Sequence, residues 1–266
     1  MQHHHTHEKP FIDPHCNPAS QLGGMAFSIE DSTEVADARK SQDKAEDFAV
    51  LGKALARQLR YREALEIYNR GLEKYPDDLK LLRLRAGRYL TTLQCEKAIS
   101  DFQRCLERGD GELDCRYRIA LALYYQGSYK KAMEQLEKCM PLCEDFDEMG
   151  IAVIYWHTLC AYRASERPAL LSFYHEGMDV GHHIGYEKVV SVCAGKRDAN
   201  EVIKSLDNDH DPLEYGIALY GIHVYGKYFR NDGNALLDEI LRHENFWISF
   251  AYIAAWNDRH NEGRAL

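Results

Sequence analysis

Small and bulky apolar residues recur along residues 45–146 at a constant spacing of 34. Alanine stands at one such position three times, at Ala64, Ala98 and Ala132. Four residues later comes a bulky side chain, and three after that a small one: Tyr68 and Gly71, Phe102 and Cys105, Leu136 and Cys139. This period predicts stacked pairs of antiparallel helices, because a single pair cannot bury its apolar stripe without the next one.

A further small residue recurs in the first half of each repeat, at Gly52, Ala86 and Ala120. Helices whose axes approach within about 8–10 Å favour small side chains at the contact. We therefore expect these positions to mark close contacts within each pair. The predicted helices lie near residues 45–58, 61–75, 79–93, 95–108, 113–126 and 129–140.

The pattern resembles that of the tetratricopeptide repeat family. Residues 45–78 carry its marked positions: Phe48, Leu51, Gly52, Leu55, Ala64, Tyr68, Gly71 and Pro76. The second repeat departs from the pattern at Arg85, where an apolar residue is usual. The resemblance implies an all-α fold, a right-handed α-solenoid of antiparallel helix pairs. It also implies a non-catalytic scaffold whose concave groove binds a protein or peptide.

In that family the first helix of each pair lines the groove. Carried over by register, the groove residues are cationic in the first two repeats and aromatic or apolar in the third: Lys53, Arg57, Lys80, Arg83, Tyr117, Leu121 and Tyr124. The resemblance therefore implies an acidic partner with an apolar anchor, because Lys and Arg pair with carboxylates and tyrosines hold apolar groups. The alternative is that these charges only solvate helix faces, since 28% of the residues are charged.

After Cys143 the register loosens. Residues 147–163 are apolar on most sides, which predicts a buried helix. Ala169 and Phe173 repeat the earlier alanine and bulky pair, which predicts the second helix of a fourth, degenerate repeat. Asp211 followed by Pro212 favours a helix start, and residues 244–257, rich in aromatics, predict a capping helix. This half resembles a group of bacterial repeat proteins with a similar last helix.

These patterns divide the chain into three regions. Residues 1–40 are predicted to be a disordered, His-rich tail and linker, because residues 2–18 show no helical period. Within this region a first helix is expected to start near Ser32 and to merge into the repeats. Residues 41–146 hold the three regular repeats, and residues 147–266 hold degenerate repeats and the capping helix. The oligomeric state stays open, because the aromatic last helix is also suited to pairing between chains.

The net charge of −9 argues against general nucleic-acid binding, which needs a basic surface. No apolar run is long enough to span a membrane, and no apolar signal segment is visible. We therefore expect a cytoplasmic protein, no membrane contact, and cysteines that stay thiols.

No motif for catalysis or phosphate binding is present, and we predict no enzyme activity, no catalytic residue, no metal and no cofactor. Cys139, Cys143, His157 and Cys160 lack the spacing of a structural zinc site. The histidines His175, His182 and His183, with Glu176, are interpreted as a surface loop. The alternative is an enzyme or small-ligand site in the C-terminal half, around His182, His183 and residues 215–228.

Overall fold

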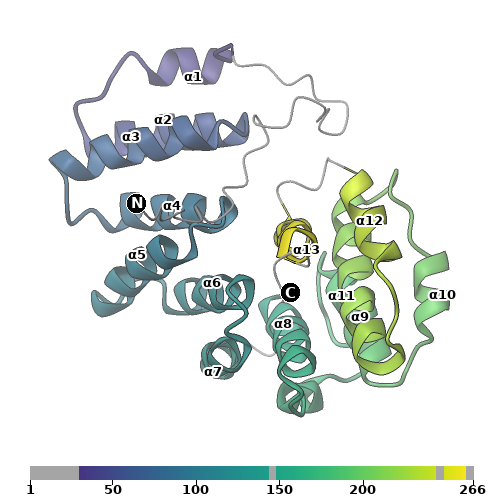
Figure 1. The fold of residues 1–266 in the computed structure, drawn as a ribbon. Helices are drawn as coiled ribbons and strands as arrows, with labels where there is room; N and C mark the ends of the chain where they lie inside the picture. Colours follow the sequence, from purple (N-terminus) through teal and green to yellow (C-terminus); the bar gives the residue numbers. More distant parts are fainter. Residues whose placement is uncertain (1–29, 144–147, 244–248, 262–266) are drawn as a thin grey trace, which may run out of the picture. The chain divides into compact units, whose positions relative to one another are not determined.

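The computed structural model describes residues 30–143, 148–243 and 249–261, and within these ranges every regular element is helical (Figure 1). The chain forms two compact units, one ending at Asp110 and one beginning at Gly111. The predictions for the His-rich tail up to residue 29, and for Phe246 and Trp247 in the last helix, lie outside the described residues.

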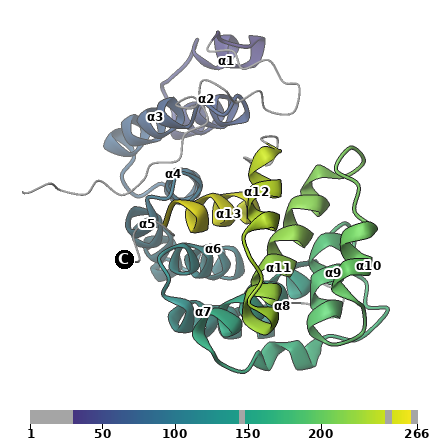
Figure 2. The same cartoon turned by 45° about the vertical axis from the view of Figure 1, so that its right-hand side comes forward.

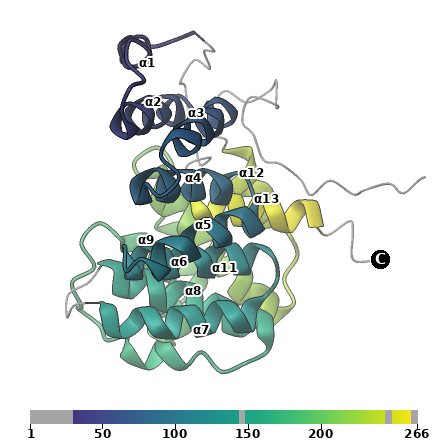
Figure 3. The same ribbon diagram turned by 90° about the vertical axis from the view of Figure 1, so that its left-hand side faces the viewer.

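The first unit contains a short helix and the first two repeats. Helix α1 (Thr33–Ala38) begins at Ser32, whose hydroxyl accepts the backbone N–H of Val35. The repeats form α2 (Ala45–Arg57) with α3 (Tyr61–Lys74), and α4 (Leu79–Thr91) with α5 (Cys95–Glu107). The two helices of each pair lie side by side (Figure 3), and their bounds confirm the pairs predicted from the spacing.

The small residues of the first repeat lie where helices approach most closely. A Cβ added to Gly52 would lie 2.1 Å from Cε1 of Tyr68, so glycine there makes room for the tyrosine ring of α3. A Cβ added to Gly71 would lie 2.9 Å from both Phe48 and Leu81. Ala64 of the same repeat is fully buried. The recurring small residues therefore set the helix spacing, as the pattern predicts.

Arg85, which departs from the repeat pattern, lies in a largely buried polar group. Its guanidinium donates to both oxygens of Asp101, at 2.7 and 2.9 Å, and to Oδ1 of Asn69 at 2.9 Å. A buried cation needs such partners to offset the loss of its hydration. Arg85 stands where the repeat pattern has an apolar residue, and Asp101 and Asn69 on the adjoining helices supply the polar partners that it needs.

The second unit begins with the third repeat, α6 (Glu112–Tyr125) and α7 (Tyr129–Cys139), and Ala132 is buried there as predicted. A single 3₁₀ turn follows at Met140–Leu142. The helices beyond it are α8 (Glu148–Ala164), α9 (Ile184–Cys193), α10 (Ala199–Lys204), α11 (Pro212–Arg230), α12 (Ala235–Arg242) and α13 (Phe250–Asn261).

Helix α8 is the centre of the second unit. Every residue from Gly150 to Tyr162 is buried, which confirms the prediction of a helix covered on most sides. The rings of Tyr155 and Trp156 meet edge to face, with centroids 5.2 Å apart, and Tyr155 meets Tyr186 of α9 at 4.8 Å. Such aromatic pairs add to the free energy of burial itself.

The predicted second helix of a fourth repeat does not form. Residues Ala169–Phe173 make only a 3₁₀ helix, and the side chain of Phe173 is 57% exposed. Gly177 and Gly181 follow with φ of +80° and +52°, a left-handed conformation that turns the chain away from a helical path. The prediction was wrong because it weighed the Ala–Phe spacing above these turn residues; α9 packs on α8 instead.

Helix α13 closes the second unit. It packs against α11 and α12 on one side and against α6 on the other, as Figure 2 shows. The last helix therefore does not stack onto the end of the array as a further repeat would. It packs back against the third repeat instead. Among the described residues, no helix is both long enough and apolar enough to cross a membrane.

Candidate functional site

The four predicted groove cations all lie in the first unit. Lys53 and Arg57 are exposed on α2, Lys80 is exposed on α4, and Arg83 is half-exposed on α4. Three of them have a carboxylate partner: Arg57 with Glu34, Lys80 with Glu46 at 2.6 Å, and Arg83 with Asp110 at 3.3 Å. Exposed ion pairs contribute about 0–1 kcal/mol, so a carboxylate of a ligand can replace the protein carboxylate in such a pair at a small cost in free energy.

Lys53 differs from the other three cations. It forms no ion pair with any residue in the part of the chain that the structure describes. Of the four predicted groove cations, three are therefore paired within the described chain and Lys53 is not. The assignment of these four residues to a binding groove stays a prediction.

The three groove residues predicted in the third repeat lie in the second unit and are buried. The side chains of Tyr117, Leu121 and Tyr124 on α6 are 5%, 1% and 3% exposed. Burial raises the pKa of Tyr117 well above its usual value. In this structure these side chains pack against other parts of the same chain.

Helix α13 covers this face of α6. The ring of Phe250 meets Tyr117 edge to face, with centroids 6.5 Å apart, and its carbonyl oxygen accepts the Tyr125 hydroxyl at 3.0 Å. Asn257 donates from Nδ2 to the carbonyl oxygen of Tyr125 at 2.9 Å. The capping helix predicted from the aromatic residues thus fills part of the surface that the repeat register assigned to a partner.

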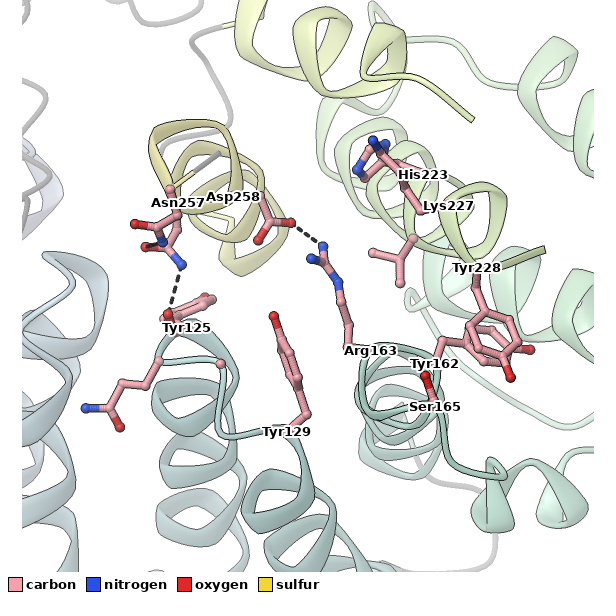
Figure 4. Close-up of a pocket in the computed structure, with 14 residues that line it drawn as sticks. Tyr125, Tyr129, Tyr162, Arg163, Ser165, His223, Lys227, Tyr228, Asn257 and Asp258 are labelled. Carbon is pink, nitrogen blue, oxygen red and sulfur yellow. Dashed lines mark hydrogen bonds and ion pairs between the residues drawn. The ribbon is translucent and has the colours of Figure 1, made fainter. Parts of the chain in front are cut away.

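Next to α13 an open cavity of about 760 Å³ remains (Figure 4). Its walls come from the C-terminal ends of α6, α8 and α11, the first residue of α7, and α13. The lining residues are Tyr125, Gln126, Gly127, Tyr129, Tyr162, Arg163, Ser165, His223, Val224, Lys227, Tyr228, Asn257, Asp258 and Asn261. All of them belong to the second unit.

A hydrogen-bonded network forms one wall of the cavity. Asp258 of α13 pairs with Arg163 of α8 and accepts the hydroxyl of Tyr220 from α11 at 2.9 Å. The hydroxyls of Tyr220 and Tyr124 lie 2.7 Å apart, so the network also reaches α6. Four helices are thus held at one point, which fixes the position of Arg163 before any ligand binds.

The cavity has more positive than negative groups. The charge of Arg163 is balanced by Asp258, but Lys227, exposed at the edge, has no ion-pair partner within the described ranges. His223 is 3% exposed, and burial, with further effects of Arg163 and Lys227, lowers its pKa to about 3. It is therefore neutral at pH 7, and the net charge of the cavity comes from Lys227.

Aromatic rings supply the apolar part of the site. Tyr162 stacks on Tyr228 with centroids 4.7 Å apart, and Phe229 meets Tyr162 edge to face at 5.2 Å. Tyr228 and Phe229 are 45% and 55% exposed. On the opposite wall Tyr129 extends from α7 toward the same space as Arg163 (Figure 4). A ligand entering the cavity therefore meets rings on two sides.

Sequence reasoning did not identify Arg163, Lys227 or Asp258 as site residues. Each stands near the C-terminal end of a helix, where Arg163 and Lys227 have an ordinary role in balancing the helix dipole and Asp258 an ordinary role in solvation. Arg163, Lys227 and Asp258 come close together only because α13 packs beside α8 and α11. The one available signal was the aromatic density of residues 215–228, which the alternative hypothesis already assigned to a ligand site.

The other candidates from the sequence lie elsewhere. Cys139 is buried, and its thiol, whose pKa burial raises to about 12, donates to the carbonyl oxygen of Leu113. Cys160 is buried too, and His157 bonds to Glu137 at 3.3 Å. These groups do not converge on a metal position among the described residues. His182 and His183 do not line the cavity.

The ranges that the structure describes are all-helical, with sequential antiparallel helix pairs, and the three regular repeats are similar to tetratricopeptide repeats. Among solved structures it is similar to YrrB, described as a TPR protein with an unusual peptide-binding site. The match covers 73% of this chain and 100% of that chain, at 17% sequence identity and a TM-score of 0.46. No family model and no curated protein matches the chain.

Proposed function

We propose that the protein is a non-catalytic scaffold that binds an acidic protein segment, and that the cavity beside α13 is its principal site. The observation that carries this proposal is the combination of Arg163 and Lys227 with tyrosine rings in one open cavity of about 760 Å³. Charged groups orient a carboxylate, and rings accept the neighbouring side chain at low entropic cost.

The charge of the site defines the partner. Arg163 is held by Asp258 and Tyr220, so it keeps its direction when a ligand enters. Lys227 supplies the uncompensated charge, since no carboxylate of the described chain neutralises it. A ligand carboxylate placed between the two forms charge-assisted hydrogen bonds, whereas a basic segment meets like charge.

The rings define the residue next to the carboxylate. Tyr228, which lines the cavity, and the adjoining Phe229 each expose about half of their surface to solvent. Covering such rings with an apolar or aromatic side chain removes apolar area from water at about 25 cal/mol per Å². The partner that fits best is an acidic segment with one bulky apolar residue beside its carboxylate.

A peptide array tests this proposal. The full-length protein is incubated with random peptides, and affinities of the selected sequences are measured for the wild type and for Lys227→Glu. We expect acidic peptides with an apolar neighbour to be selected, and their affinity to fall at least tenfold in the variant. Lys204→Glu on α10 is the matched control, because Lys204 is exposed and lies outside the cavity. Selection of basic peptides would contradict the proposal.

The size of the cavity favours a small anionic molecule as a second candidate. Sites for small ligands typically enclose about 300–1,000 Å³, and this cavity lies within that range. His223, whose Nδ1 is buried without a hydrogen-bond partner in the described structure, adds a polar group to the wall. A thermal-shift screen of small carboxylic acids distinguishes the two candidates. A small-molecule site should raise the melting temperature with one of these acids, whereas a peptide site should respond only to peptide segments.

A further inference from the structure

A histidine and glutamate cluster lies at the N-terminal end of α8, away from the cavity. Its members are Glu148, His182 and His183. Nδ1 of His182 lies 3.0 Å from Oε1 of Glu148, and Nδ1 of His183 lies 3.8 Å from Oε2. One ligand atom from each of the three residues lies within 4.8 Å of the others. None of them contributes to the cavity beside α13.

The local backbone builds this cluster. Gly181 has φ of +52°, and a Cβ there would lie 1.8 Å from Oε1 of Glu148, so a side chain at this position would strain the backbone and displace the carboxylate. The backbone N–H of His182 faces the same oxygen at 3.4 Å. His183 stands directly before α9, and its ring meets Tyr186 edge to face at 5.3 Å, which orients the imidazole.

The chemistry of the donors suits a divalent transition metal. Two imidazole nitrogens and one carboxylate oxygen are a ligand set that zinc accepts, with a fourth position left for water. Bond lengths of about 2.0–2.1 Å place tetrahedral ligands about 3.4 Å apart. Nδ1 of His182 already lies 3.0 Å from Oε1 of Glu148, and the three ligand atoms lie within 4.8 Å of one another before any ion binds. His182 is 75% exposed, so its ring is free to rotate and shorten the remaining separation.

We propose that Glu148, His182 and His183 form a zinc site. The ion would join the first turn of α8 to the loop that precedes α9, two segments that are 34 residues apart along the chain. Its role is structural: an ion that binds only the folded state adds to the free energy of unfolding as its concentration rises above the dissociation constant. The site is independent of the proposed peptide binding.

Zinc titration of the full-length protein tests the site. Protein freed of metal by dialysis against a chelator is titrated with zinc chloride in a calorimeter, and with cobalt(II) to record the visible spectrum of tetrahedral coordination. A background variant replaces His3, His4, His5, His7 and His15 by Ala, because these histidines offer further imidazole ligands that would compete in the titration. In this background we expect one equivalent of zinc, and affinity at least tenfold lower in His182→Ala and in Glu148→Gln.

The controls make the result decisive. His175→Ala removes an exposed histidine of the same loop that lies outside the cluster, and it should leave the titration unchanged. His182 is largely exposed, so its replacement should leave the folded protein intact, which circular dichroism checks. The proposal is overturned if the background variant binds no zinc, or if His182→Ala and Glu148→Gln bind it as tightly as the background does.

Discussion

The glycines of the first repeat show how single positions set the distance between helices. Gly52 faces the ring of Tyr68, and Gly71 faces Phe48 and Leu81. At neither position does the backbone need a left-handed conformation, so the requirement is space alone. The spacing of small residues in the sequence predicted a close helix contact at Gly52 within the first pair. It did not identify Tyr68 as the partner of Gly52, or Phe48 and Leu81 as the partners of Gly71.

Substitution of Gly52 tests this account. Gly52→Ala should destabilise the first unit by about 1–3 kcal/mol, because its methyl group would overlap the Tyr68 ring. Gly87→Ala on α4 is the control: nothing lies within 4 Å of the added Cβ, so it should be neutral or stabilise by up to about 1 kcal/mol. Denaturant unfolding followed by circular dichroism measures both. Equal effects would show that the helices are not in the described contact.

The protonation of His223 links the stability of the second unit to pH. Its pKa is lowered to about 3, chiefly by burial and then by Arg163 and Lys227, whereas that of an unfolded histidine is about 6.5. Between these values the unfolded state binds the extra proton. The free energy of unfolding therefore falls as the pH decreases from about 6.5 toward 3, with a slope of up to about 1.4 kcal/mol per pH unit.

His223→Gln should remove this contribution. The free energy of unfolding of the variant should change less steeply than that of the wild type between pH 6.5 and 4.5. All three tryptophans of the chain lie after Gly111, so their fluorescence follows the unfolding of the second unit. His210→Gln serves as control, since His210 is exposed. Parallel pH profiles for wild type and His223→Gln would contradict the assignment.

At the scale of elements, the second unit is organised by two helices, α8 at its centre and α13 at its edge. The helix at residues 148–164 could be predicted because its apolar residues cover every side. The docking of α13 could not, because an aromatic helix of this kind has several faces able to pack. What decides its position is polar: Asp258 meets Arg163 and Tyr220, and Asn257 meets the carbonyl oxygen of Tyr125.

Loss of Asp258 should loosen this arrangement. Asp258→Ala leaves Arg163 and Tyr220 without their shared carboxylate, and we expect a loss of about 2–4 kcal/mol in the free energy of unfolding, followed by tryptophan fluorescence. Arg259→Ala on the next position of α13 removes an exposed pair with Asp238 and should cost about 0–1 kcal/mol. Similar losses in the two variants would show that the network does not hold α13.

At the scale of the whole molecule, the protein is acidic, and the lysines of the two candidate surfaces are exposed. The net charge is −9, yet Lys53 in the first unit and Lys227 in the second have no ion-pair partner within the described residues. Each of these lysines is therefore able to pair with a carboxylate of an acidic partner, while the net charge of the protein opposes the approach of that partner.

The first-unit cations are tested separately from the cavity. Lys53→Glu combined with Arg83→Glu should leave the circular dichroism spectrum unchanged, because both side chains are at least partly exposed. If these residues contribute to binding, the affinity for a selected acidic peptide falls several-fold, measured by fluorescence anisotropy. Lys97→Glu on α5 is the control, because Lys97 is not among the predicted groove residues. Unchanged affinity would limit the site to the second unit.

The paired helices of all three repeats could be predicted from the sequence, because the same small and bulky residues return every 34 residues and make the same local contacts. The sequence also predicted the buried helix around Trp156 and the helix start at Asp211, whose side chain accepts the N–H of Glu214 at 2.9 Å. The cavity could not be predicted, because Arg163, Lys227 and Asp258 meet only through contacts between distant parts of the chain. The periodicity of a helix predicts which of its faces is buried, but it does not predict which distant helices pack against that face.

The most direct test of the central claim is a double-mutant cycle between Lys227 and the carboxylate of a selected peptide. Affinities are measured for wild type and Lys227→Glu, each with the acidic peptide and with one in which lysine replaces the acidic residue. If the cavity binds that carboxylate, the double change restores much of the affinity that each single change removes, and the coupling energy is about 1 kcal/mol or more. Additive losses, with a coupling energy near zero, would show that the peptide binds elsewhere.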